Sequence, residues 1–299
     1  MFLFEPFAYP FMQQALLVGA VIAVLCALLS CLLILRGWSL MGDAISHAVL
    51  PGIVLAYRMG LPLALGAFLS GWCYALATGY VRQHSRLKED TVMGVIFTGL
   101  FAVGLVLFSQ TPSDLHLDHI LFGNILGIPV SQVRETCAIS LALVLFLLAR
   151  RRDFLLVAFD PFHAQALGLS VKWLNYLLLA LLSLAIVVSL QAVGILLVIA
   201  MLITPGATAF LLTDRYDRML QLATASSLIA TLSGIIISYH LDAATSACIV
   251  LMQAAQFLVA WLFAPKNGIV AQWRHRSSSQ SKARDHSNLT LAPESDRQR

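Results

Sequence analysis

The chain has 299 residues, of which 59% are hydrophobic and 11% are charged. Soluble globular proteins carry about 45–50% apolar and about 25% charged residues, so a soluble domain could not bury this apolar surplus. The net charge of +4 is too small to indicate a nucleic-acid partner. Since a membrane-spanning helix needs about 20 apolar residues, the composition predicts an all-α, polytopic membrane protein with eight or nine transmembrane helices.

Apolar runs between polar breaks divide the chain into nine candidate spans with approximate bounds. They are Ala15–Leu35, Leu40–Ala56, Leu61–Val81, Thr91–Ser109, Val130–Ala149, Trp173–Val193, Gly194–Leu212, Met219–Tyr239 and Ala243–Phe263. The second span is the weakest, because Asp43, His47 and the Pro51–Gly52 pair interrupt it. We expect this segment to be bent or to span the membrane only partly.

Lysine and arginine collect in alternating loops, and cytoplasmic loops carry the excess of these residues. The basic segments are Arg82–Asp90, Arg150–Lys172, the turn with Arg215 and Arg218, and the tail after Phe263. The loop 110–129 and the turn 240–242 contain neither residue. The pattern predicts an outer N-terminus, a cytoplasmic C-terminus and nine crossings, which requires the second segment to cross.

Residues 1–264 are expected to form one transmembrane domain, followed by a disordered cytoplasmic tail at 265–299. The tail is rich in Ser, Arg and Gln and has too few apolar residues to fold alone. Two Pro–Gly pairs, at 51–52 and 205–206, interrupt segments that run in opposite directions in this topology. They indicate an inverted repeat around a central pathway, and two independent kinks explain them equally well.

The five cysteines lie within or beside apolar runs and form no CxxC pair, which excludes a zinc knuckle or a redox motif. We expect them to be small buried membrane residues. They are Cys26, Cys31, Cys73, Cys137 and Cys248. The sequence also lacks the HExxH, GxSxG and GxxxxGK[ST] motifs, so neither a catalytic centre nor a Walker loop for ATP is predicted.

Asp43 and His47 are four residues apart, so a helix would place both side chains on one face. An ionisable residue inside a membrane costs about 2.5–3.5 kcal/mol and usually faces a pathway or a partner. A carboxylate oxygen and an imidazole nitrogen suit a divalent first-row metal ion. The alternative is structural: an Asp–His hydrogen bond at a helix start, with Asp43 as the cap.

The stretch after Arg152 is too polar and too interrupted to span the membrane. Asp160 and Pro161 are typical of a helix start, and Gly168 is typical of a helix end. The predicted short helix would lie on the inner surface, either docked into a partner protein or embedded among lipid headgroups. Its apolar face would carry Phe159, Phe162 and Leu167.

The outer loop 110–129 contains a group of oxygen and nitrogen ligands, namely Asp114, His116, Asp118 and His119. Such a group is predicted either to attract a cation or to form part of a docking surface for a partner protein. A solvated loop with incidental acidic residues is the alternative.

Four stretches together resemble the bacterial ABC-type manganese/iron/zinc permeases, and among these the Yfe/Sit type. They are GWSLMGDAISHAVLPGIVLAY (37–57), DLHLDHILFGNILGI (114–128), AFDPFHAQALGLSV (158–171) and VGILLVIAMLITPGATA (193–209). They occur in the order of the family and cover the chain apart from its tail, which is not a shared feature.

The resemblance implies a fold like that of type II ABC importers and a permease subunit in the bacterial inner membrane. The subunit would move manganese or iron, and zinc as a further candidate, by alternating access and without a permanently bound cofactor. Its partners would be separate ATPase subunits that hydrolyse ATP, a second identical or paralogous permease, and an extracytoplasmic metal-binding protein. An ion-coupled secondary metal transporter that works without an ATPase is the alternative.

The resemblance also assigns roles to residues. Asp43 and His47 would lie on the translocation pathway and contact the metal ion in transit. Coupling to the ATPase would involve five residues of the inner segment: Phe159, Asp160, Pro161, Phe162 and Gly168. If the four outer-loop residues form a docking surface, which is one of the alternatives given above, the delivery protein would be its partner.

Overall fold

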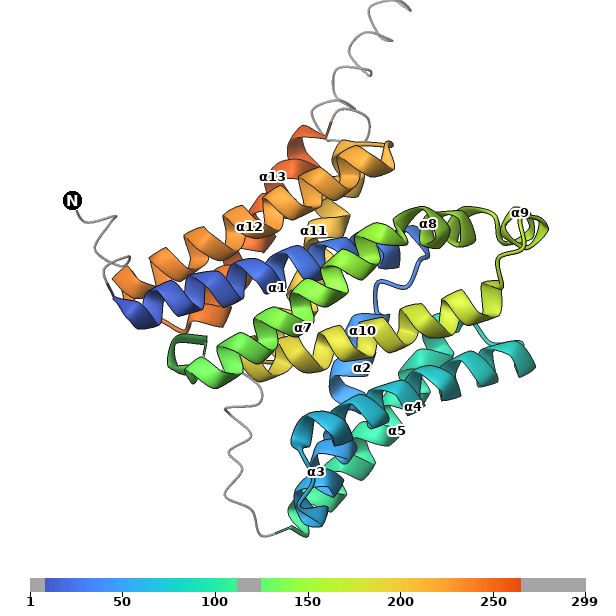
Figure 1. Cartoon of the computed structure of the whole chain (residues 1–299), viewed down its shortest axis with the longest axis horizontal. Helices are drawn as coiled ribbons and strands as arrows, with labels where there is room; N and C mark the ends of the chain where they lie inside the picture. Colours follow the sequence, from blue (N-terminus) through green and yellow to red (C-terminus); the bar gives the residue numbers. More distant parts are fainter. Residues whose placement is uncertain (1–8, 112–124, 265–299) are drawn as a thin grey trace, which may run out of the picture.

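The computed structural model describes residues 9–111 and 125–264, and every regular element in these ranges is a helix (Figure 1). The α-helices are α1 (Pro10–Leu35), α2 (Met41–Ala48), α3 (Leu50–Met59), α4 (Leu63–His84), α5 (Glu89–Ser109), α7 (Val130–Ala149), α8 (Arg151–Phe159), α9 (Pro161–Ala166), α10 (Val171–Val193), α11 (Ile195–Leu212), α12 (Tyr216–Leu241) and α13 (Thr245–Phe263). A short 3₁₀ helix, η2 (Ile125–Gly127), precedes α7.

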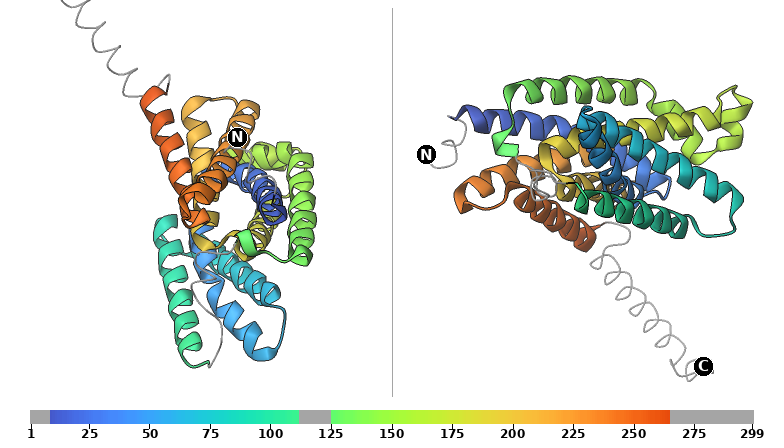
Figure 2. Two further views of the ribbon diagram at one scale, coloured as in Figure 1. Left: turned by 90° about the vertical axis from the view of Figure 1, so that its left-hand side faces the viewer. Right: turned by 90° about the horizontal axis from the view of Figure 1, so that it is seen from below.

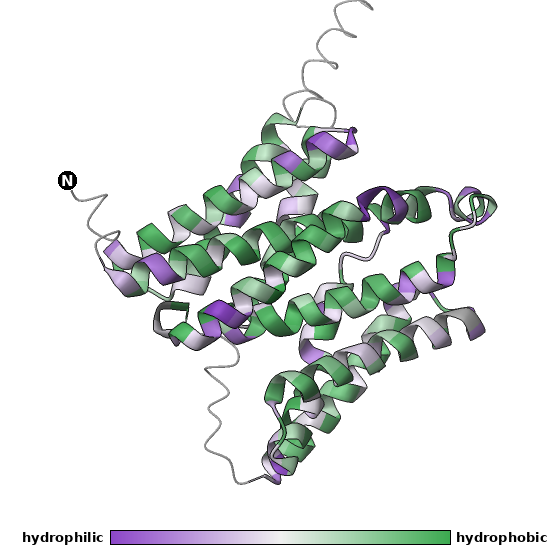
Figure 3. Ribbon diagram, in the orientation of Figure 1, coloured by the Kyte–Doolittle hydropathy of each residue, from purple (hydrophilic) through white to green (hydrophobic). Residues whose placement is uncertain are grey.

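Eight helices in the described ranges are long and apolar enough to cross a membrane: α1, α4, α5, α7, α10, α11, α12 and α13. Figure 3 shows these helices as mainly hydrophobic, with hydrophilic residues gathered near several of the helix ends. The prediction of an all-α, polytopic membrane protein is therefore confirmed.

The second predicted segment is bent, as expected. It forms α2 and α3, which meet at Val49, and Pro51 lies in the first turn of α3. A proline lacks the backbone N–H that would continue the hydrogen-bond ladder, so the helix breaks just before it. α3 ends at Gly60, which adopts a positive φ of 67°. Neither helix alone is long enough to span, so the ninth crossing stays a prediction.

The helices form two groups (Figures 1 and 2). The first group surrounds α1, which packs against α7, α11 and α12, while α13 packs against α11 and α12. The second group consists of α3, α4 and α5, which pack against one another. α2 lies between the groups and contacts α4 and α5 on one side and α10 and α11 on the other. The short helix with Asp43 and His47 thus connects both halves of the molecule.

Glycine allows α3 and α4 to approach closely. A Cβ atom on Gly52 would overlap the carbonyl oxygen of Gly66, and a Cβ atom on Gly66 would overlap that of Gly52. Just before α3, the Ser70 hydroxyl of α4 donates a hydrogen bond to the carbonyl oxygen of Ala48, the last residue of α2, at 2.7 Å. Membrane helices commonly associate through such small residues, because these let two backbones make dispersion contacts directly.

The second Pro–Gly pair also lies at a close helix contact. Pro205 lies inside the continuous helix α11, and the Ser30 hydroxyl of α1 accepts a hydrogen bond from the Gly206 N–H at 2.9 Å. The same hydroxyl donates to the Ile203 carbonyl oxygen at 3.2 Å. Side-chain hydroxyls often satisfy the backbone groups that a membrane proline frees. That the two Pro–Gly pairs belong to an inverted repeat stays a prediction.

The cysteine prediction is confirmed in part. Cys26, Cys31 and Cys248 are buried, whereas Cys137 is half-buried. The prediction is wrong for Cys73, which is exposed on α4 beside an apolar groove between α3, α4 and α5. Its outward position is consistent with the low burial of α4, since only 28% of the apolar span of this helix is buried inside the protein.

Candidate functional site

Asp43 and His47 contact each other on one face of α2. Asp43 lies in the first turn of this helix and His47 in the last, and Oδ1 of the carboxylate is 3.3 Å from Nε2 of the imidazole. Their side chains are 33% and 27% exposed, respectively. The start of α2 has no side-chain cap, so the capping role considered for Asp43 is not observed, whereas the Asp–His contact is present.

Two aromatic rings of α5 enclose the imidazole of His47. The ring centroids of Phe97 and Phe101 lie 6.0 and 5.3 Å from that of His47, and Phe101 meets it edge-on. The Nδ1 atom of His47 is buried and has no hydrogen-bond partner among the described residues. Neither phenylalanine was predicted to contact His47, although their i, i+4 spacing places them on one face of a helix.

The opposite face of α2 is fixed by close packing. A Cβ atom on Gly42 would lie 2.9 Å from the Leu202 side chain of α11, so the two helices touch at this position. Ile45 is fully buried, and the buried Ser46 hydroxyl donates to the Gly42 carbonyl oxygen at 2.8 Å. This packing limits the freedom of the helix that carries Asp43 and His47.

The described part of the chain contains no group of three or more His, Cys, Asp or Glu side chains that could hold a metal ion. Asp43 and His47 therefore stand as a pair of candidate ligands. The four outer-loop residues of the sequence analysis lie outside the described residues: Asp114, His116, Asp118 and His119.

The inner segment forms two short helices, α8 and α9. The Asp160 carboxylate accepts a hydrogen bond from the His163 N–H at 2.9 Å, Pro161 is the first residue of α9, and Gly168 follows its end with a φ of 81°. The predicted helix start and end are thus confirmed. The separate helix α8 was not predicted. α9 lies at one end of the molecule, beyond α7 and α8 (Figure 1).

The apolar residues predicted for this segment are exposed. The exposed fractions are 66% for Phe159, 83% for Phe162 and 63% for Leu167. Apolar surface of this kind on a short, capped helix is typical of a site that binds a partner or a lipid surface. The geometry alone is compatible with either occupant.

Known proteins resemble this chain over most of its length. The sequence model of the ABC 3 transport family matches residues 8–264. The chain is 57% identical over 259 residues to the chelated iron transport system membrane protein YfeD of Yersinia pestis, covering 87% of each protein. It is 49% identical over 276 residues to the manganese transport system membrane protein MntB of Synechocystis, covering 92% of this chain and 90% of the relative.

A solved structure agrees with the fold. The structure described as PsaBC from Streptococcus pneumoniae in complex with Fab superposes with a TM-score of 0.78 at 37% sequence identity. The match covers 87% of this chain and 94% of that one. The helix arrangement described above is therefore shared with a known structure.

Proposed function

The chain belongs to the ABC 3 transport family, and on that premise we propose that it is the permease subunit of an ATP-driven importer of manganese or iron. The Asp43–His47 pair on α2 carries the proposal, because it brings a carboxylate and an imidazole into contact between the two groups of apolar helices. These ligands suit manganese, iron and zinc similarly. The names of the relatives, which refer to iron and manganese, favour the first two metals.

The geometry of the pair fits a shared metal ion. Bonds of about 2.1 Å to each ligand, as in carboxylate and imidazole sites, would enclose an angle of about 100° at a separation of 3.3 Å. This angle is close to the tetrahedral value. Both side chains could thus ligate one ion without leaving their positions on α2.

A second permease would complete the pathway. Asp43 and His47 are each about one-third exposed on the single chain, and a carboxylate facing lipid would cost about 2.5–3.5 kcal/mol. Two ligands are also fewer than the roughly four that a transition-metal site usually provides. A second copy or a paralogue that covers the α2–α5 face would remove this lipid exposure and supply further ligands.

A small number of ligands per subunit suits transport. An ion in transit must bind well enough to enter and weakly enough to leave. The phenylalanine rings beside His47 offer no strong ligands, so they would exclude water without holding the ion. We therefore expect no tightly bound metal ion in the isolated permease.

Separate ATPase subunits on the cytoplasmic side would drive transport by hydrolysing ATP. The exposed phenylalanines Phe159 and Phe162 flank the Asp160 cap and would insert into a groove of the ATPase. Pro161 and Gly168 would set the start and the end of the docking helix. The Lys and Arg distribution predicts that this segment and the C-terminus lie in the cytoplasm, and an extracytoplasmic binding protein would deliver the metal to the opposite side.

Metal uptake by cells that lack their own manganese and iron importers tests the proposal. The cells would express this chain with its ATPase and its delivery protein, and radioactive manganese would be measured with competing iron or zinc. We expect ATP-dependent accumulation of manganese that iron suppresses. Accumulation that persists when the ATPase can no longer hydrolyse ATP would contradict the proposal and favour a secondary transporter.

A further inference from the structure

A basic cavity of about 540 Å³ lies between α8 and the start of α12. Its size is within the range of about 300–1,000 Å³ that is usual for small-molecule sites. Four arginine side chains and one carboxylate contribute to its walls. The lining residues are Arg151, Arg152, Leu155, Arg215, Tyr216, Asp217 and Arg218.

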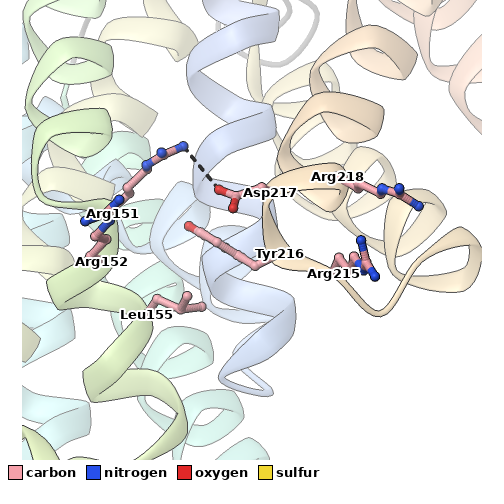
Figure 4. A pocket seen from close by; sticks show the side chains of 7 residues that line it. All are labelled: Arg151, Arg152, Leu155, Arg215, Tyr216, Asp217 and Arg218. Carbon is pink, nitrogen blue, oxygen red and sulfur yellow. Dashed lines mark ion pairs between the residues drawn. The ribbon is translucent and has the colours of Figure 1, made fainter.

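The charges of this cavity are not balanced. Arg151 pairs with Asp217 at 3.3 Å, the contact drawn in Figure 4. Arg152, Arg215 and Arg218 have no ion-pair partner in the ranges that the structure describes, and all three are exposed. In Figure 4, Arg215 and Arg218 extend from the first turn of α12 on the side away from α8. The cavity thus carries an excess of positive charge. Arg152 lies on its α8 side, and Arg215 and Arg218 lie at its α12 rim, from which their exposed side chains would turn toward α8 to contact a bound anion.

The cavity lies where two candidate membrane helices end. The span of α7 ends at Ala149, two residues before Arg151, and the span of α12 begins at Tyr216. The Lys and Arg distribution predicts that these ends lie on the cytoplasmic side. The arginines therefore lie at the depth of the lipid headgroups. The exposed Phe162 belongs to α9, which lies farther from the membrane helix α7 than α8 does (Figure 1).

We propose that this cavity binds the phosphate group of an anionic phospholipid of the cytoplasmic leaflet. Arginine presents a planar set of donors that matches phosphate oxygens, and basic pockets between transmembrane helices on this side bind anionic headgroups. Leu155 and the ring of Tyr216 offer apolar surface for the glycerol and the first acyl carbons. Bound there, one lipid would connect the inner segment α8–α9 to α12. Lipid binding of this kind would not depend on which metal ion the protein transports.

Lipid binding by the full-length chain in detergent micelles tests the proposal. Native mass spectrometry would compare retention of phosphatidylglycerol with that of phosphatidylcholine, which has no net charge. The test variant replaces Arg152 and Arg215 by Gln, one from each side of the cavity. The control variant replaces Arg58 and Arg134 by Gln, since these arginines are exposed on α3 and α7, away from the cavity.

We expect the protein to prefer phosphatidylglycerol and the test variant to bind it about 30-fold more weakly, with the control unchanged. Replacement of the same two residues by Lys keeps the charge but not the planar donors, so it should restore part of the affinity, which separates loss of charge from a folding defect. Equal affinity in the test and control variants would overturn the proposal. Displacement of the lipid by inorganic phosphate would identify free phosphate as the ligand instead. Unchanged lipid binding together with loss of the ATPase from the purified complex would identify a protein-docking surface instead.

Discussion

The hydroxyl of Ser30 connects α1 to α11 beside Pro205, which lies inside α11. It accepts a hydrogen bond from Gly206 and donates one to the carbonyl of Ile203, so one side chain satisfies two backbone groups. Leu202, which packs against Gly42 of α2, belongs to the same turn. Ser30 thereby helps to position the helix that carries Asp43 and His47.

Replacement of Ser30 by Ala should destabilise the protein by about 1–3 kcal/mol, because it removes two hydrogen bonds between α1 and the backbone of α11. Thermal unfolding of the full-length chain in detergent would measure this loss. Ser233→Ala is the matched control, because the Ser233 hydroxyl bonds only to carbonyl groups of its own helix. Equal midpoints for both variants would contradict the role assigned to Ser30.

Only the part of the candidate site that lies on one helix could be predicted from the sequence. Asp43 and His47 lie four residues apart, so their contact follows from helix geometry once the segment is known to be helical. Phe97 and Phe101 come from a helix some 50 positions later in the sequence, and no local pattern connects them to His47. Their role depends on tertiary packing, which the sequence alone does not reveal.

The contact between α3 and α4 depends on the absence of side chains at Gly52 and Gly66. Gly66→Ala should lower the free energy of unfolding by about 1–3 kcal/mol, because the added methyl group meets backbone atoms that cannot rotate away. Gly79→Ala on the same helix is the control, since a Cβ atom there would meet nothing within 4 Å. Unfolding curves that shift equally for both variants would contradict a close α3–α4 contact.

The short helix α9 is expected to hold the ATPase through an aromatic anchor. Phe162→Asp should weaken the complex about 30-fold or more, because buried aromatic anchors dominate the energy of such interfaces. Co-purification of the ATPase with the tagged permease would measure the effect. Gln165→Asp introduces the same charge at another exposed position of α9 and should leave the complex intact. Retention of the ATPase by the Phe162 variant would show that docking occurs elsewhere.

Elements were predicted well wherever proline, glycine or a long apolar run marks their bounds. The break between α2 and α3 follows from Pro51, and the start of α9 follows from Asp160 and Pro161. α8 lacks such markers at its start and begins almost directly after α7. For this reason α8 was not predicted as a helix separate from the segment that follows it. The outward position of Cys73 was likewise not predictable, because apolar side chains in a membrane can face either protein or lipid.

At the scale of the whole molecule, the number of crossings depends on α2 and α3. If these two helices together cross the membrane, the turn at Leu61 lies on the same side as Asp242 and opposite Lys88. We expect Leu61→Cys and Asp242→Cys, each in a background without the five native cysteines, to react with a membrane-impermeant maleimide in intact spheroplasts. Lys88→Cys should react only after permeabilisation, because basic loops face the cytoplasm. Leu40→Cys, just before α2, should also react only after permeabilisation, because a crossing segment separates Leu40 from Leu61. Reaction of Leu40→Cys and Leu61→Cys from the same side would show that the segment re-enters instead of crossing.

If the Asp43–His47 pair contacts the metal ion during transport, the Asp43→Asn variant should lose manganese uptake. Asn keeps the size of the side chain but removes its charge, so manganese uptake should fall about tenfold or more while the complex with the ATPase persists. Asp242→Asn is the matched control at an exposed turn, where the positive φ of 48° suits Asn, and its uptake should stay at the wild-type rate. Uptake by Asp43→Asn at the wild-type rate would contradict the account and leave the pair with a structural role only.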